Sequence, residues 1–91
     1  MMTESTHVDG NAAAGAFADV LGFDVTTATL TCAGCGRVGA FAESHVYLRA
    51  PGIVVRCPRC GHVLARLAQT PTYVWLELRG AQSWRVPFPA R

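Results

Sequence analysis

Two short cysteine loops decide the fold of this chain: CAGCG at Cys32–Gly36 and CPRCG at Cys57–Gly61. They contain all four cysteines of the sequence. Two cysteines separated by two residues can turn both sulfurs toward one point, and a second pair completes the tetrahedron of thiolates that zinc prefers. The glycine that ends each loop suits a backbone that turns its N–H groups toward a thiolate with positive φ. The predicted metal ligands are Cys32, Cys35, Cys57 and Cys60.

The pairing of the two loops makes this signal specific. One CxxC motif alone also fits a redox dithiol, and two disulfides or two independent redox pairs are alternative uses of four cysteines. Two CxxCG loops separated by residues 36–56 instead favour one metal site. Four cysteines fill a tetrahedral ion and leave no position for an activated water, so the metal is expected to be structural. We expect Zn²⁺, with iron as the less favoured ion.

The length of 91 residues predicts one domain. So short a chain buries only about 60–65% of its unfolded surface, whereas a structural zinc supplies roughly 10–16 kcal/mol of apparent binding free energy that also stabilises the fold. We predict a flexible N-terminus at residues 1–8 and a single zinc-ribbon domain at residues 9–91. The polar N-terminus resembles no signal peptide, and no apolar run approaches the roughly 18 residues of a membrane helix. We therefore expect a cytoplasmic protein without membrane contact, where thiols favour metal over disulfides.

Charge is unevenly distributed along the chain. Residues 1–31 contain four acidic residues and no basic one, and residues 32–91 contain eight arginines and two acidic residues. Either the acidic segment docks on the basic part, or the basic part meets an acidic partner such as nucleic acid. Every basic residue is arginine, which codon bias in a GC-rich genome also produces, so the arginine count alone decides neither interpretation.

The N-terminal half predicts one helix followed by short strands. Asp9 or Asn11 can cap a helix at about residues 11–21, which Gly22 ends in a left-handed conformation. Its apolar stripe favours a helix that covers one face of the ribbon, and an exposed docking helix is the alternative. Strands are expected at 26–31, 45–49 and 53–56, with a short ambiguous one within 37–42. The strands at 45–49 and 53–56 form a hairpin between the cysteine loops.

The C-terminal part predicts three strands, within 62–69, 73–79 and 82–88, joined by close turns into an antiparallel meander. The predicted fold class is therefore mostly β with one N-terminal helix, a zinc ribbon with two CxxCG knuckles followed by an antiparallel β-meander. In the middle strand, alternation places Val74, Leu76 and Leu78 toward the core. The residues of the other face, with two arginines of neighbouring strands, form the candidate partner-binding surface: Arg66, Tyr73, Trp75, Arg79 and Arg85.

Three interpretations of that surface remain open. Aromatic rings interleaved with arginines can stack the bases of single-stranded nucleic acid. Trp75 packed on the helix or in a second small core, with Glu77 paired to an arginine across strands, is the favoured structural interpretation. A protein partner is the third.

No catalytic constellation emerges from the sequence, and we expect no enzyme. His7 and Asp9 with Ser5 nearby lie at a terminus that cannot preorganise a nucleophile. His62 directly follows the second loop, and we expect it to support a thiolate or face solvent because four cysteines already complete the site. We interpret His45 as an ordinary strand residue.

Six runs carry a family resemblance, at residues 9–12, 21–24, 32–39, 45–47, 50–52 and 56–61. In them the chain resembles a family of small, uncharacterised actinobacterial zinc-ribbon proteins, known only as a domain of unknown function. The resemblance implies a four-cysteine zinc-ribbon-like fold with ligands at Cys32, Cys35, Cys57 and Cys60, and no established activity. It also suggests an oxidoreductase as partner, because relatives are encoded near flavin or molybdopterin oxidoreductases.

More distantly, CxxCG followed by CPxCG is similar to rubredoxins, whose iron carries one electron. Rubredoxins are usually acidic and pack aromatics on the iron, whereas this ribbon is basic and its aromatics lie mostly after the second loop. The leading hypothesis is a non-enzymatic structural-zinc protein that binds a macromolecule, a protein in preference to nucleic acid. The alternatives are a rubredoxin-like one-electron carrier and a thiol redox switch that releases zinc on oxidation.

Overall fold

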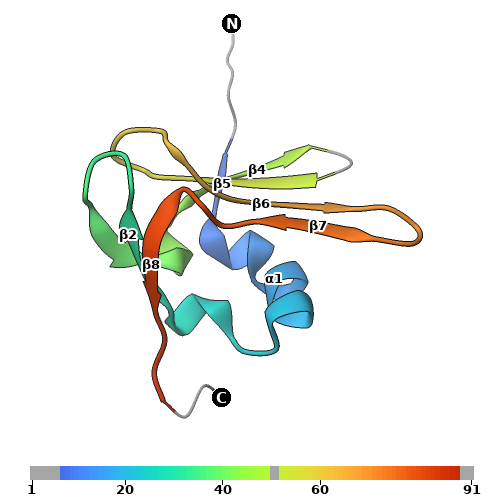
Figure 1. Cartoon of the computed structure of the whole chain (residues 1–91). Coiled ribbons are helices and arrows are strands. Elements are labelled where there is room, and N and C mark those ends of the chain that lie inside the picture. Colours follow the sequence, from blue (N-terminus) through green and yellow to red (C-terminus); the bar gives the residue numbers. More distant parts are fainter. Residues whose placement is uncertain (1–6, 50–51, 89–91) are drawn as a thin grey trace, which may run out of the picture.

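Two antiparallel sheets make up most of the computed structural model, which describes residues 7–49 and 52–88 (Figure 1). The five-stranded sheet has the order β1-β4-β5-β6-β7, and the three-stranded sheet has the order β3-β2-β8. The predicted fold class, mostly β with one N-terminal helix and a ribbon-like cysteine site, is confirmed. The strands are β1 (Val8–Asp9), β2 (Thr29–Cys32), β3 (Val38–Ala40), β4 (His45–Arg49), β5 (Gly52–Arg56), β6 (Val63–Gln69), β7 (Val74–Glu77) and β8 (Ala81–Arg85).

The N-terminal helix forms in two parts. The Asp9 carboxylate accepts a hydrogen bond from the Asn11 N–H at 3.0 Å and starts the 3-10 helix η1 (Gly10–Ala13), which continues as α1 (Ala14–Leu21). Gly22 ends α1 with φ of 85°, a left-handed conformation that costs glycine nothing sterically. The predicted helix, its Asp9 cap and its Gly22 stop are thus present, with a tighter first turn. Most of the N-terminus expected to be flexible lies outside the described residues, and its Val8 pairs with Val46 in β4.

The strand expected at residues 26–31 is shorter than predicted. The Asp24 carboxylate accepts from the N–H of Thr26 at 3.0 Å and from its hydroxyl at 2.7 Å. These bonds hold the 3-10 helix η2 (Val25–Thr27), so β2 begins only at Thr29. The threonines favour a strand by propensity, but a side-chain cap that satisfies backbone N–H groups outweighs it.

The hairpin predicted between the cysteine loops is present as β4 and β5, which pair Val46 with Val55. Its turn residues Ala50 and Pro51 lie outside the described residues. The ambiguous segment within 37–42 forms β3 and then the 3-10 helix η3 (Phe41–Glu43).

The predicted meander is wrong in its last strand. β5, β6 and β7 are consecutive antiparallel neighbours, but β8 leaves this sheet and pairs with β2, placing Trp84 opposite Leu30. There the Trp84 ring lies 5.7 Å from the Phe41 ring, measured between centroids. Packing of this large ring against the core explains why β8 joins the second sheet, a long-range preference that a local turn pattern does not reveal.

One core lies between the helical segments and the two sheets (Figure 1). Phe17 of α1 meets Phe41 edge to face at a centroid distance of 5.4 Å, and both side chains are fully buried. The inner face of the five-stranded sheet, turned toward the helices, contributes Val46, Val55, Ala65 and Leu67. No helix in the described ranges is long and apolar enough to cross a membrane.

The outer face of the five-stranded sheet points away from the helices. The strand register places it on alternate residues of β4 to β7. Its members, which we call the outer face throughout, are His45, Tyr47, Arg49, Gly52, Val54, Arg56, Arg66, Ala68, Trp75 and Glu77.

Candidate metal centre and sheet surface

The four cysteine sulfurs come together in one cluster, in which every ligand atom lies within 4.8 Å of the others. Cys32 Sγ lies 3.7 Å from Cys60 Sγ, and Cys35 Sγ lies 3.7 Å from Cys57 Sγ. A disulfide would hold its sulfurs about 2.05 Å apart, and all four cysteines are free. The cluster joins each cysteine of one loop to a cysteine of the other, so the loops form one site rather than two dithiols.

The spacing fits a tetrahedral metal ion. If each sulfur lies about 2.3 Å from a central zinc, neighbouring sulfurs of a regular tetrahedron are about 3.8 Å apart. The two cross-loop distances of 3.7 Å agree with this edge length. The residues present therefore fit a tetrathiolate metal site, in which all four protein ligands of a tetrahedral ion are supplied.

The two loops have the same backbone design. In the first, the Gly36 N–H donates to the Cys32 carbonyl at 2.9 Å, and in the second the Gly61 N–H donates to the Cys57 carbonyl at 2.9 Å. Gly36 and Gly61 have φ of 78° and 80°, the left-handed region that only glycine enters cheaply. The glycine ending each motif is thus required by the turn, as the sequence predicts.

Backbone N–H groups point at the sulfurs, as metal-bound thiolates require. Gly34 donates to Cys32 Sγ at 3.3 Å, and Arg59 donates to Cys57 Sγ at 3.4 Å. The N–H of His62 donates to Cys60 Sγ at 3.4 Å. Such bonds stabilise negative charge on sulfur and hold the ligands in place.

Each loop belongs to a different sheet. The first follows β2 and leads to β3 in the three-stranded sheet, and the second joins β5 to β6 in the five-stranded sheet. The cysteine cluster therefore ties the two sheets together at one end of the molecule. Gly80 lies at the same junction: its carbonyl accepts from the Ala33 N–H at 2.9 Å, and a Cβ there would overlap the Val63 carbonyl oxygen.

The thiols differ in acidity. Burial acts to raise the pKa of the Cys57 thiol, but hydrogen bonds from the amides of Cys60 and Arg59 and from neighbouring thiols lower the pKa to about 7. At Cys60 the His62 amide acts to lower the pKa, but desolvation and the other three thiols raise it to about 11. A bound cation would favour deprotonation of its thiol ligands, because metals bind cysteine as thiolate.

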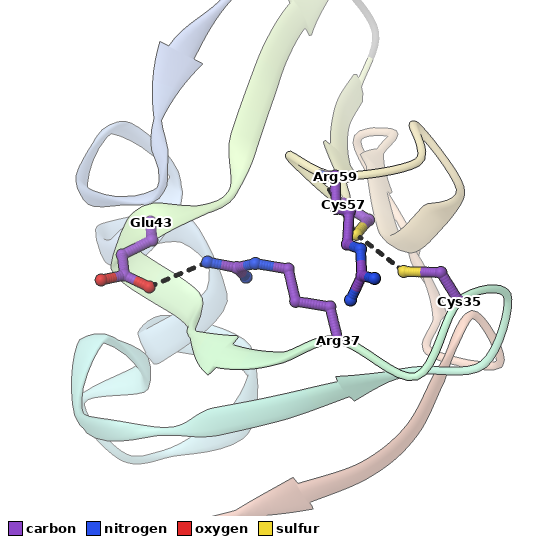
Figure 2. A network of polar contacts seen from close by, with 5 residues as sticks. All are labelled: Cys35, Arg37, Glu43, Cys57 and Arg59. Atoms are coloured by element: carbon purple, nitrogen blue, oxygen red, sulfur yellow. Dashed lines mark hydrogen bonds and ion pairs between the residues drawn. The ribbon is translucent and has the colours of Figure 1, made fainter.

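Arg37, which follows the first loop, is engaged away from the cluster. Figure 2 shows Arg37 extending away from the sulfurs toward Glu43, with which it forms a 3.0 Å ion pair, while Cys35 and Cys57 point at each other.

The His62 ring packs on Gly34, where an added Cβ would lie 3.0 Å from it. His62 therefore supports the site through its amide and its ring contact, as expected for a residue outside the ligand set.

The predicted partner surface is only partly assembled. Arg66, Trp75 and Arg79 line one surface groove of about 580 Å³ along β7, and Tyr73 precedes that strand with its side chain 69% exposed. Arg85 does not join them, because β8 belongs to the other sheet, where Arg85 lies opposite Thr29.

Two packing expectations for β7 are wrong. Trp75 is 67% exposed rather than packed on the helix, and Val74 is 41% exposed rather than buried. β7 is an edge strand with a short overlap on the core, so only Leu76 of the strand and Leu78 just after it pack against the core. The predicted cross-strand ion pair is present: Arg66 lies 3.6 Å from the Glu77 carboxylate, which Arg79 also contacts.

Three residues of this surface escaped the sequence-based prediction. Tyr47, Arg49 and Arg56 lie on the outer face with Arg66 and Trp75. The alternation that revealed the polar side of β7 also holds in the β4–β5 hairpin, so it could have identified them. What the sequence lacks is the strand order, which places β4 and β7 in one sheet.

The chain belongs to the family of unknown function DUF6510, whose model matches residues 4–89. No curated protein and no solved structure matches the chain.

Proposed function

We propose that this chain is a non-enzymatic interaction module that carries a structural zinc ion and binds a macromolecular partner on the outer face of its five-stranded sheet. The observation that carries the proposal is the cluster of four sulfurs with tetrahedral spacing at the junction of the two sheets. Four cysteine ligands leave such an ion no position for substrate or water. The ion would therefore stabilise the fold rather than catalyse a reaction.

The residues whose side chains are of catalytic types have structural contacts instead. The Asp9 carboxylate caps η1 through the Asn11 N–H. His7 stacks on His45 with ring centroids 3.7 Å apart. These contacts favour a binding role over a hydrolytic one, because a catalytic histidine needs a nucleophile and an orienting carboxylate within hydrogen-bond reach. Ser5 lies outside the described residues.

The cysteine chemistry also supports a cytoplasmic location for the module. Free thiols at metal-binding spacing persist in a reducing compartment, where disulfides are rare. An oxidoreductase partner, which the family resemblance suggests, belongs to the same compartment. A partner is expected to approach the outer face, since the inner face is occupied by the core.

Elemental analysis together with a visible absorption spectrum tests the metal assignment. We expect one zinc per chain and no visible colour. One iron per chain with sulfur-to-iron charge-transfer bands would instead assign the one-electron carrier, because the same four thiolates bind iron. Peroxide treatment addresses the redox switch: release of zinc at physiological doses supports it, and retention of zinc rejects it.

A further inference from the structure

We propose that the outer face binds single-stranded nucleic acid, with bases stacked on Trp75 and Tyr47 and phosphates held by the arginines of the grooves beside these rings. The inference rests on the proposed function, because it names the partner of the same module. It does not depend on which metal ion the cysteines hold.

The shape of the outer face suits a chain that crosses the strands. Tyr47 lies on β4 and Trp75 on β7, three strand spacings apart, which is about 14 Å across the sheet at roughly 4.8 Å per strand. They lie in neighbouring rows, since Tyr47 aligns with Glu77 and Trp75 aligns with Arg49. In the row that runs from Arg49 to Trp75, the intervening residues are Gly52 and Ala68. Small residues in this row leave room for bases to lie against the sheet.

Each ring borders a surface groove lined by arginine. The groove beside Trp75 includes Arg66 and Arg79, and the groove beside Tyr47 includes Arg49 and Arg56. The Arg56 guanidinium lies 5.7 Å from the Tyr47 ring centroid, which keeps a positive charge at that ring. Aromatic platforms next to positive grooves are how proteins hold single strands without reading their sequence.

The described part of the acidic N-terminal segment does not neutralise the charge of this face. Asp9 caps η1, Asp24 caps η2, and the ion pairs among the described residues involve neither of them nor Asp19. Asp19 and Asp24 line a groove on α1, on the helical side of the molecule. The structure thus favours the second of the two charge interpretations, a basic surface that meets an acidic partner.

Although the sequence alone favours a protein partner, nucleic acid fits the outer face better than an acidic protein does. Protein interfaces also favour arginine and aromatic residues, but they place mainly apolar residues at their centre. Here the middle of the face carries Arg66 beside Val54 and Ala68, and its largest ring, Trp75, is 67% exposed. An exposed aromatic ring gives a base a surface to stack on, and the arginine beside it adds a guanidinium group that can also contact the base.

The test measures fluorescence anisotropy of labelled, mixed-sequence single-stranded RNA and DNA of about 16 nucleotides, titrated with metal-loaded protein. We expect binding that weakens as salt rises from about 50 to 200 mM, because phosphate contacts release counterions. Heparin serves as a polyanion without bases. Metal content and thermal unfolding are checked for every variant, so that loss of folding is not mistaken for loss of binding.

Two variants with matched controls locate the site. Trp75→Ala should weaken oligonucleotide binding roughly 5- to 150-fold, the loss expected for one stacked base, whereas Phe88→Ala removes a ring that is 98% exposed outside the sheets and should change nothing. Arg49→Gln should lower the slope of log K against log salt by about 0.7, the value for one phosphate contact. Arg85→Gln removes an exposed arginine of the other sheet and should leave the slope unchanged.

Several outcomes would overturn the assignment. Absence of binding at low salt by folded, metal-loaded protein rejects nucleic acid and leaves an acidic protein surface as the occupant. Equal losses for Trp75→Ala and Phe88→Ala, or heparin binding as tight as oligonucleotide binding with no effect of Trp75→Ala, reduce the face to a nonspecific basic patch. None of these results touches the metal content, on which the proposed structural role depends.

Discussion

The two faces of the five-stranded sheet use alternate residues of the same strands for opposite purposes. On β5, Val55 is fully buried against the core while Val54, its neighbour in sequence, lies on the outer face between Tyr47 and Arg66. The inner face is apolar because it must exclude water, and the outer face keeps arginines that would be too costly to bury. The comparison suggests that stability depends on one face and recognition on the other.

Both faces depend on the cysteine cluster. The second loop is the connection between β5 and β6, which supply residues to both faces. The first loop belongs to the other sheet, so the cluster fixes the two sheets relative to each other. A metal ion bound there would stabilise the core and the outer face at once.

Loss of the metal should therefore have the largest effect, because it should unfold both faces of the sheet together. Cys57→Ser removes one ligand from a small core, and we expect cooperative unfolding to disappear, since metal binding contributes roughly 10–16 kcal/mol that is also folding free energy. Circular dichroism during thermal melting measures this. Arg59→Gln in the same loop keeps the backbone N–H that contacts Cys57 Sγ and should retain metal and folding. A cooperative melt of Cys57→Ser would contradict the prediction.

The next effect separates the faces directly. Val55→Ala removes two methyl groups from a fully buried site and should lower the free energy of unfolding by about 2–3 kcal/mol, through lost burial and the cavity left behind. Val54→Ala makes the same chemical change on the outer face and should lower it by less than about 1 kcal/mol. Denaturant titration of the metal-loaded proteins gives both values. Equal losses would show that the outer face is also part of the core.

A smaller effect should follow from the helix that covers the inner face. Gly15 of α1 has open space where a Cβ would lie, so Gly15→Ala should stabilise the protein by about 0.5–1 kcal/mol. Gly80→Ala is the contrasting change, because its Cβ would overlap the Val63 carbonyl and should destabilise the junction of the sheets by about 1–3 kcal/mol. Thermal melts measure both shifts. Oligonucleotide affinity of Gly15→Ala should equal that of the wild type, and a change would couple the helix to the outer face.

The sequence predicts what is local and misses what depends on strand order. The cysteine spacing, the Asp9 cap, the Gly22 stop and the β4–β5 hairpin each depend on residues close in sequence, and each is found. The partner of β8 is decided by Trp84, which packs on Phe41, a contact between distant segments. That choice removes Arg85 from the candidate surface, and the strand order places Tyr47 and Arg49 of β4 in the same sheet as β7.

The smallest expected effect concerns Glu77 of β7, the acidic residue of the outer face that pairs with Arg66 of β6. The side chains of Arg79 and Arg66 hold the pKa of Glu77 below its ordinary value. A lowered folded-state pKa means that the ion pairs stabilise the fold above the unfolded pKa, and that this contribution is lost as pH falls through the folded pKa. The melting temperature of Glu77→Gln should therefore be slightly lower than that of the wild type. The difference should be the same at any pH between about 5 and 7.

The same substitution should act on recognition in the opposite direction. The neutral amide that Glu77→Gln introduces cannot neutralise Arg66 and Arg79, so an anionic ligand gains two unpaired guanidinium groups, and oligonucleotide affinity at low salt should rise. Anisotropy titrations of Glu77→Gln beside the wild type measure this, and the inner-face variant Val55→Ala should show no comparable gain. A gain in affinity together with a small loss of stability would show that the outer face keeps charges for binding rather than for folding. Unchanged affinity would mean that the phosphates do not reach Arg66 and Arg79.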